Sequence, residues 1–172
     1  MDRGYSDRKL LELTIVAQIN ARVPPGQINI PPELEDLVEL DPDIGVPRPR
    51  VISVVDLQME AMENLMAAMA AWSDYLRTVA GIFERESKQV SAAMEEREFD
   101  IFMRCEGSIE LRKKQAKHHP DVKALSFDLR VLDGAAHRLN DATHGLDNYV
   151  GVLKYALRSA LKFRDSSGNV YR

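Results

Sequence analysis

The feature that most constrains this chain is a heptad pattern of apolar residues between Val122 and Ala160. Apolar side chains recur there at alternating steps of three and four residues, with the polar Thr143 as the one interruption. The full pattern is Val122, Leu125, Leu129, Leu132, Ala136, Leu139, Thr143, Leu146, Val150, Leu153, Leu157 and Ala160. An average spacing of 3.5 residues keeps one narrow stripe of a helix facing a partner helix, and it predicts left-handed supercoiling. A helix of roughly 60 Å, at about 1.5 Å per residue, is therefore expected to need a partner.

The partner is predicted upstream, in a first long helix from about residue 53 to 104. Its apolar stripe is less regular, because Glu86 and Ser87 interrupt it. Methionines at core spacing indicate packing more than a binding surface. The residues expected to pack or to support oligomers are Met62, Met69, Trp72, Leu76, Leu129, Leu132, Leu139, Leu146 and Leu153. With a second helix over 121–164 and a linker over 105–120, we expect an all-α fold built on a long antiparallel, coiled-coil hairpin.

The first fifty residues carry a different kind of sequence. Residues 1–23 are predicted to form a short N-terminal helix, and residues 24–50 hold seven of the eight prolines together with six acidic side chains. Because proline fixes its own backbone angle and restricts the residue before it, we expect an extended arm with at most one helical turn near 33–40. The arm either grips a neighbouring subunit, mimics a polyanion, or is an exposed, partly ordered linker. Residues 51–172 complete the expected organisation as a single hairpin domain.

Charge and composition exclude several classes of protein. The net charge of −4 excludes a uniformly basic nucleic-acid binder. Its distribution is uneven, since residues 1–103 carry 10 Lys and Arg against 19 Asp and Glu, and residues 104–172 carry 13 against 8. Such asymmetry indicates either a C-terminal half that binds anions or matched faces within an oligomer. A single cysteine, Cys105, and no long apolar run predict a protein of a reducing compartment, the cytoplasm, that does not span a membrane.

No catalytic or metal-binding pattern is found in the sequence. Glycines 134, 145 and 151 stand singly in the second helix, where they are expected to permit close packing or to mark a kink. His137 and His144 lie two turns apart, too far to share one metal ion without further ligands. We therefore expect neither an enzyme nor a bound cofactor.

The linker is the one candidate for a binding site. Basic side chains gather in and around it, with Phe99 and Phe102 just before it. Such a set can bind a phosphate backbone while aromatic rings stack on bases. The residues proposed for nucleic-acid binding are Arg104, Arg112, Lys113, Lys114, Lys117, His118 and Lys123. The alternative is a solvated, lysine-rich turn between two helices.

The layout resembles the small helical recombination mediators of tailed phages, the UvsY-like family, over about residues 55–168. A long helix ends in an aromatic stretch and a glycine, Glu98-Phe-Asp-Ile-Phe-Met-Arg-Cys-Glu-Gly107. A charged linker follows, and then an Asp-led, leucine-patterned helix starting at Asp121 that finishes in a basic stretch and Ser-Gly.

The resemblance implies a non-enzymatic, ring-forming protein. Such mediators load a recombinase onto single-stranded DNA that is covered by single-strand-binding protein, in the cytoplasm of the infected host. The family's DNA-binding segment before the glycine is basic, whereas the matching stretch here holds Glu98, Asp100 and Glu106. The expected DNA contact therefore moves to Arg104 and the linker cations.

Two other classes of function stay open at this point. The chain is alternatively a structural or assembly protein, such as a virion or scaffold component, whose helices contact only protein. It is also compatible with an inhibitor whose acidic arm mimics nucleic acid. All three classes are consistent with a homo-oligomer, because a two-helix hairpin leaves the edges of its apolar stripes exposed.

Overall fold

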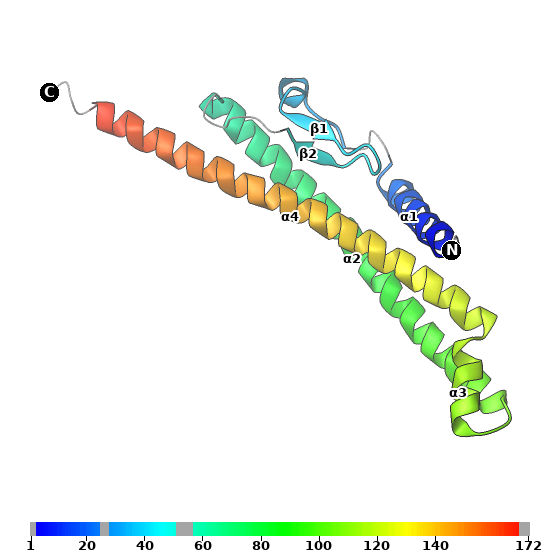
Figure 1. Ribbon diagram of the computed structural model, residues 1–172. Coiled ribbons are helices and arrows are strands. Elements are labelled where there is room, and N and C mark those ends of the chain that lie inside the picture. The colour runs from blue at the N-terminus through cyan, green and yellow to red at the C-terminus, as the bar shows by residue number, and fades with distance from the viewer. Residues whose placement is uncertain (1–2, 25–27, 51–56, 169–172) are drawn as a thin grey trace. The chain divides into compact units, whose positions relative to one another are not determined.

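The computed structural model describes residues 3–24, 28–50 and 57–168 (Figure 1). Its elements are α1 (Arg3–Arg22), the 3₁₀ helix η1 (Pro32–Leu34), β1 (Val38–Leu40), β2 (Pro47–Pro49), α2 (Met59–Arg104), α3 (Ile109–Lys117) and α4 (Pro120–Gly168). Helices account for most of the described chain, and the strands form one two-stranded sheet. The predicted all-α class is confirmed.

The long helices differ slightly from the predicted bounds. α2 begins at Met59 rather than near residue 53, and residues 53–56 lie outside the described part of the chain. α4 begins at Pro120 and extends to Gly168, past the predicted end at 164. Proline suits the first position of a helix, because its missing N–H would have no partner within the helix there.

The chain forms two compact units that cut across the division expected from the sequence. The first unit contains Met1–Arg22 and Val79–Arg138, and the second contains Val23–Thr78 and Leu139–Arg172. α2 and α4 therefore contribute one stretch to each unit. The N-terminal segment belongs with the middle of the chain, and the Pro-rich segment belongs with the end of α4.

In the first unit, α2 and α4 run antiparallel. Ser87 Oγ donates a hydrogen bond to the Asp133 carboxylate, and Arg97 Nε donates to Asp121 Oδ2 at 3.0 Å. A step toward the C-terminus of α2 thus corresponds to a step toward the N-terminus of α4. The buried apolar side chains of this unit include Phe83, Val131 and Ala135. The antiparallel pairing agrees with the sequence analysis, while the supercoiling stays a prediction.

α1 packs within the first unit through both apolar and charged side chains. Ile19 is fully buried. The Arg22 guanidinium lies 4.3 Å from the centre of the Phe83 ring and pairs with Glu86 at 2.6 Å. Glu86 interrupts the apolar stripe of α2 in the sequence. In the structure it forms the ion pair with the last residue of α1.

Gly134 provides the room for α1 to approach α4. A Cβ atom at this position would lie 2.5 Å from Ile15 Cδ1, closer than two carbon atoms can pack. At Gly81, also in the first unit, a Cβ would meet no atom of the described chain within 4 Å. Close packing, one of the two roles expected for the glycines of α4, is therefore found at Gly134.

These two glycines should respond differently to the same substitution. Gly81→Ala is expected to raise the free energy of unfolding by about 0.5–1 kcal/mol, because alanine is the better helix former. Gly134→Ala should give none of this gain, since Ile15 must move aside. Urea denaturation measures both, and adding Ile15→Val, which removes Cδ1, should restore the gain. Equal stabilisation by the two single variants would contradict the contact.

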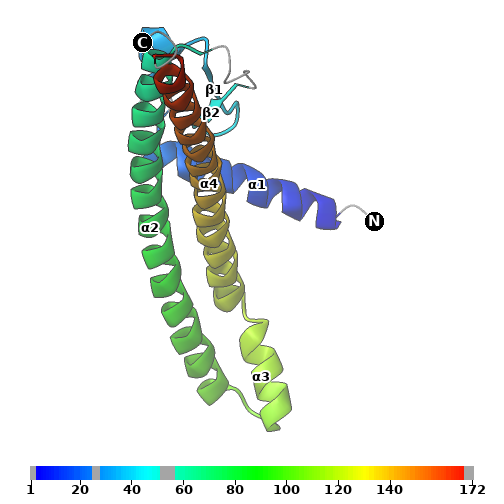
Figure 2. The same cartoon turned by 90° about the vertical axis from the view of Figure 1, so that its left-hand side faces the viewer.

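In the second unit, α2 and α4 lie side by side and are joined by a polar contact within an apolar interface (Figure 2). Ser73 is buried, and its hydroxyl donates to Asp147 Oδ1 at 2.6 Å, while Arg77 pairs with Asp147 Oδ2 at 2.8 Å. Thr143 is also buried and donates to the Leu139 carbonyl one turn earlier, at 2.9 Å. The buried side chains of the two helices include Met62, Leu65, Met69, Trp72, Leu76, Leu139, Leu146, Val150 and Leu153.

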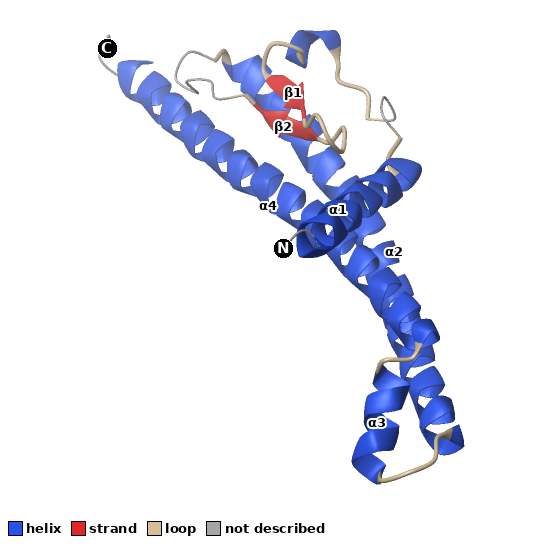
Figure 3. Cartoon of the chain, turned by 45° about the vertical axis from the view of Figure 1, so that its right-hand side comes forward, coloured by secondary structure: helices blue, strands red, loops and turns tan. Residues whose placement is uncertain are grey.

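The Pro-rich segment is a folded hairpin and not the extended arm expected from its prolines. β1 pairs antiparallel with β2, so that Val38 lies opposite Pro49 and Leu40 lies opposite Pro47 (Figure 3). The ladder is continued by hydrogen bonds from Asp41 N to Val46 O, at 2.8 Å, and from Arg50 N to Leu37 O, at 3.0 Å. The buried apolar side chains of this segment include Ile28, Leu34, Val38, Ile44, Val46 and Pro47.

The turn of the hairpin explains why the prolines do not keep the segment extended. Asp41 Oδ1 accepts hydrogen bonds from the N–H groups of Asp43 and Ile44, at 3.0 and 3.2 Å. Gly45 has a φ of +63°, which glycine adopts without steric cost. The one helical turn expected near 33–40 is present as η1. At least one of the six acidic residues forms an ion pair within the hairpin, since Glu39 pairs with Arg48 at 2.9 Å.

Candidate nucleic-acid interface

The segment predicted as a basic linker contains a helix of its own, α3. Gly107, with a φ of +112°, lies in the turn that follows α2, and Ser108 Oγ accepts a hydrogen bond from Leu111 N at 3.3 Å as the N-cap of α3. After Ile109, the residues Glu-Leu-Arg-Lys-Lys-Gln-Ala-Lys117 are strong helix formers. The N-cap serine and the high helix propensity are both visible in the sequence and both favour α3. Apolar periodicity, on which the prediction of a linker is based, does not detect them.

α3 is anchored in the first unit by a small core and by Arg112. Ala116 is fully buried in a cluster with Ile101 of α2 and Val122 of α4. Arg112 donates from Nε and Nη2 to the Phe102 carbonyl, at 3.0 and 2.7 Å, and its guanidinium lies 4.2 Å from the centre of the Phe102 ring. Arg112, predicted as a DNA contact, thus has a structural role that binds α3 to the last turns of α2.

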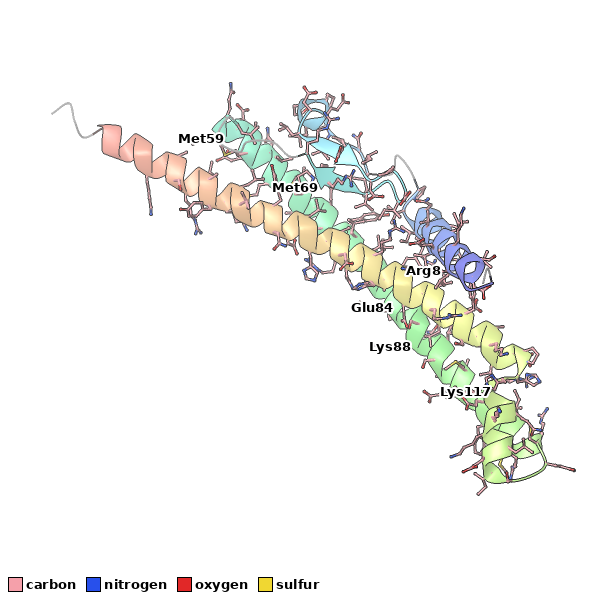
Figure 4. The ribbon with its side chains drawn as sticks, viewed as in Figure 1. Arg8, Met59, Met69, Glu84, Lys88 and Lys117 are labelled. Atoms are coloured by element: carbon pink, nitrogen blue, oxygen red, sulfur yellow. The ribbon has the colours of Figure 1, made fainter. Side chains whose placement is uncertain are left out.

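The other predicted cations lie on the surface at the same end of the first unit. Arg104 is in the last turn of α2, Lys123 is in the first turns of α4, and both are exposed. Lys113, Lys114 and Lys117 are exposed on α3, with Lys117 labelled in Figure 4, and His118 is exposed at its C-terminus. Between Arg104 and Lys123 the sequence has six Lys and Arg against three Asp and Glu. This end is therefore locally basic within an acidic protein.

A groove lies between α2 and α3, next to these cations. Its volume is about 350 Å³, and it is lined by Glu95, Glu98, Phe99, Phe102, Lys113 and Ala116. Phe99 is 62% exposed, although large aromatic side chains are usually buried. The groove therefore offers an aromatic surface with a cation on the α3 side and two carboxylates on the α2 side.

The ion pair between Arg97 and Asp121 joins the beginning of α4 to α2. Arg97 donates to Asp121 Oδ2 from both Nε and Nη2. This hydrogen bonding lowers the pKa of Asp121, an effect that partial burial opposes, and it raises the pKa of Arg97. His119 Nδ1 accepts a hydrogen bond from Asp121 N at 3.3 Å. The start of α4 is thus held by charge as well as by packing.

The shifted pKa of Asp121 predicts a loss of stability in acid. A lowered folded-state pKa means that this carboxylate stabilises the fold above its unfolded pKa of about 3.9, and that the contribution disappears as the pH falls further. The stability of Asp121→Asn should therefore change less between pH 5 and pH 3 than that of the wild type. Thermal unfolding at a series of pH values measures this, and identical pH profiles would exclude a role for the pair.

The described residues offer little other chemistry. They contain no group of three or more His, Cys, Asp or Glu side chains that could hold a metal ion. Cys105 is half-buried beside the small core that anchors α3. Within the same part of the chain, none of the helices combines the length and the apolar character needed to cross a membrane. Comparison of the chain with protein-family models, curated proteins and solved structures finds no match.

The predicted packing residues separate into two groups. Buried positions in the second unit are Met62, Met69, Trp72, Leu76, Leu139, Leu146 and Leu153. Leu129 and Leu132, in the first unit, are only half-buried. The first group forms the core of its own unit, so these side chains do not remain available for contacts between chains.

Proposed function

We propose that this chain is a non-enzymatic protein that binds single-stranded DNA at the groove between α2 and α3. The observation that supports this proposal is the exposed Phe99 ring, which lines the groove together with Lys113, while Lys114 and Lys117 are exposed on the same helix, α3. Every base has a face that stacks on an aromatic ring, and lysines neutralise the phosphates on either side.

A role as a recombination mediator is the specific form of this proposal. It rests on the resemblance to the UvsY-like family, whose members load a recombinase onto single-stranded DNA covered by single-strand-binding protein. A homo-oligomer would place several copies of the basic end of the first unit along one strand, and linked weak sites bind cooperatively. The carboxylates of Glu95 and Glu98 on the α2 wall restrict the phosphate path to the α3 side.

Fluorescence anisotropy with a labelled single-stranded oligonucleotide tests the binding. The variant Lys113→Ala, Lys114→Ala, Lys117→Ala removes three exposed cations from α3. The matched control Arg8→Ala, Lys9→Ala, Lys88→Ala removes three exposed cations from α1 and α2 of the same unit (Figure 4). Each variant loses three positive charges, so the two have the same net charge and differ in the positions of the residues replaced.

Salt dependence gives the sharper readout. Loss of three phosphate contacts should reduce the slope of log affinity against log salt by about 2, because each contact with a single strand contributes about 0.7. The control should keep the wild-type slope. Equal behaviour of the two variants would reject the α3 surface as the binding site.

A protein-only assembly function is the second candidate. The observation that favours it is the exposure of Val152 and Tyr155 on α4, where apolar side chains indicate a protein contact. A well-formed oligomer that shows no salt-sensitive binding to DNA at physiological salt would support this candidate over the first.

A further inference from the structure

The groove between α2 and α3 has two walls of opposite charge. The α2 wall is formed by side chains on one side of that helix, Glu95, Glu98, Phe99 and Phe102. Lys113 lies on the other wall, which belongs to α3, and α3 lies alongside the last turns of α2 (Figure 3). Two carboxylates, exposed aromatic surface and an ammonium group therefore line one groove of about 350 Å³.

The carboxylates are the unexpected part of a surface that is proposed to bind DNA, because they repel phosphates. In the part of the chain that the structure describes, neither Glu95 nor Glu98 forms an ion pair with Lys or Arg. An ionised carboxylate accepts hydrogen bonds and donates none. Within a DNA strand the donors lie on the bases, since the phosphates and the deoxyribose ring offer only acceptors. The α2 wall is therefore suited to contact the edge of a base.

Guanine is the base whose edge matches both walls of the groove. Its N1–H and its 2-amino group lie side by side, so both can donate to one carboxylate when the base is unpaired. Its O6 and N7 accept hydrogen bonds, and a lysine is a common partner for them. Adenine and cytosine each offer one amino group to the carboxylates. Thymine has no amino group, and its carbonyl oxygens would be repelled by them.

We propose that the groove between α2 and α3 selects guanine in single-stranded DNA. The ring stacks on Phe99, the N1–H and the 2-amino group donate to the Glu98 carboxylate, and O6 or N7 accepts from Lys113. Glu98 takes the central contact because it is adjacent to Phe99 and half-buried, and a hydrogen bond is stronger where water is partly excluded. Glu95 is exposed one turn earlier on the same wall. The inference rests on the proposed function, since it names the base that this DNA site prefers.

Strands that differ in one base test the preference. Fluorescence anisotropy compares a labelled thymine oligonucleotide with strands of the same length whose central base is guanine, adenine or cytosine. The guanine strand should bind roughly 5- to 150-fold more tightly than the thymine strand, the discrimination that one bidentate contact with a base provides. Adenine controls for stacking, because it is also a purine, and its strand should bind more weakly than the guanine strand. Added salt should weaken all strands alike, since they carry the same phosphates.

The variant Glu95→Gln, Glu98→Gln tests the residues. It keeps the size of both side chains, but an amide has only one acceptor oxygen, so guanine should lose most of its advantage over adenine. The matched control Glu12→Gln, Glu96→Gln neutralises two exposed glutamates of the same unit outside the groove, and it should keep the wild-type preference. Replacing guanine by inosine, which lacks the 2-amino group, should weaken binding to the wild type and matter little for the groove variant.

Failure of this inference can be told from failure of DNA binding. Salt-sensitive binding that requires the α3 lysines but is equal for guanine, adenine and thymine strands would overturn the base preference alone. A guanine preference that persists in the Glu95→Gln, Glu98→Gln variant would overturn the assignment to these carboxylates. Binding of no strand would overturn both proposals. Equally tight binding of guanosine monophosphate would assign the groove to a free nucleotide instead of a strand.

Discussion

Replacing Phe83 by alanine is expected to lower the free energy of unfolding by about 3–5 kcal/mol. The ring is fully buried in the first unit, and the Arg22 guanidinium packs on its face at 4.3 Å. The substitution therefore removes a large apolar side chain, leaves a cavity, and takes away the surface on which α1 ends. Urea denaturation followed by circular dichroism measures the change, and protease sensitivity of α1 gives a second readout.

Phe99→Ala is the matched control, since the same substitution is made sixteen residues further along α2. Phe99 is exposed, so its loss should change the free energy of unfolding by less than about 0.5 kcal/mol. It should instead weaken DNA binding by roughly 5- to 150-fold, the equivalent of about 1–3 kcal/mol for one stacked base. A destabilised Phe99→Ala with unchanged DNA affinity would reverse the roles assigned to the two rings.

Leu34→Ala in the Pro-rich hairpin is expected to cost about 2–4 kcal/mol of stability in the second unit. Leu34 is 1% exposed at the end of η1, so its truncation leaves a cavity. Hydrogen exchange of the hairpin amides and thermal unfolding measure the local and global effects.

Leu40→Ala provides the comparison, because Leu40 belongs to the same hairpin and is 42% exposed. Its expected cost is below about 1 kcal/mol. If Leu34→Ala were as mild as Leu40→Ala, the segment would act as the linker that its prolines and acidic residues suggest, and the hairpin would contribute little to the unit.

The apolar periodicity of the sequence predicts the long helices well. Each of the twelve heptad positions between Val122 and Ala160 is buried or half-buried, including the polar Thr143. The reason is local, since the Thr143 hydroxyl donates to a carbonyl one turn earlier in the same helix. A threonine bonded in this way can lie in an apolar stripe without an unsatisfied hydroxyl group.

Residues that interrupt the stripe of α2 find their partners far away in sequence. Ser87 bonds to Asp133, 46 residues later, and Glu86 pairs with Arg22, 64 residues earlier. Periodicity within one helix contains no information about such partners. Polar residues that look like defects in a heptad pattern are here the groups that join α2 to α1 and to α4.

The hairpin and the candidate site were harder to predict for related reasons. The strands are only three residues long, too short for any period, and the turn depends on one aspartate and one glycine. The cations and aromatic residues of the site are visible in the sequence, but their grouping depends on α3. The structural role of Arg112 follows from a carbonyl at the end of another helix, which no motif describes.

The register of the hairpin has a consequence for its open side. The bonded pairs Asp41–Val46 and Leu37–Arg50 alternate with the pairs that contain Pro47 and Pro49, so the nitrogen atoms of both prolines face away from β1. Neither nitrogen carries a hydrogen, and the outer edge of β2 therefore cannot donate hydrogen bonds to another strand at these positions. Where copies of the chain gather at high local concentration, this edge resists the strand addition that leads to aggregation.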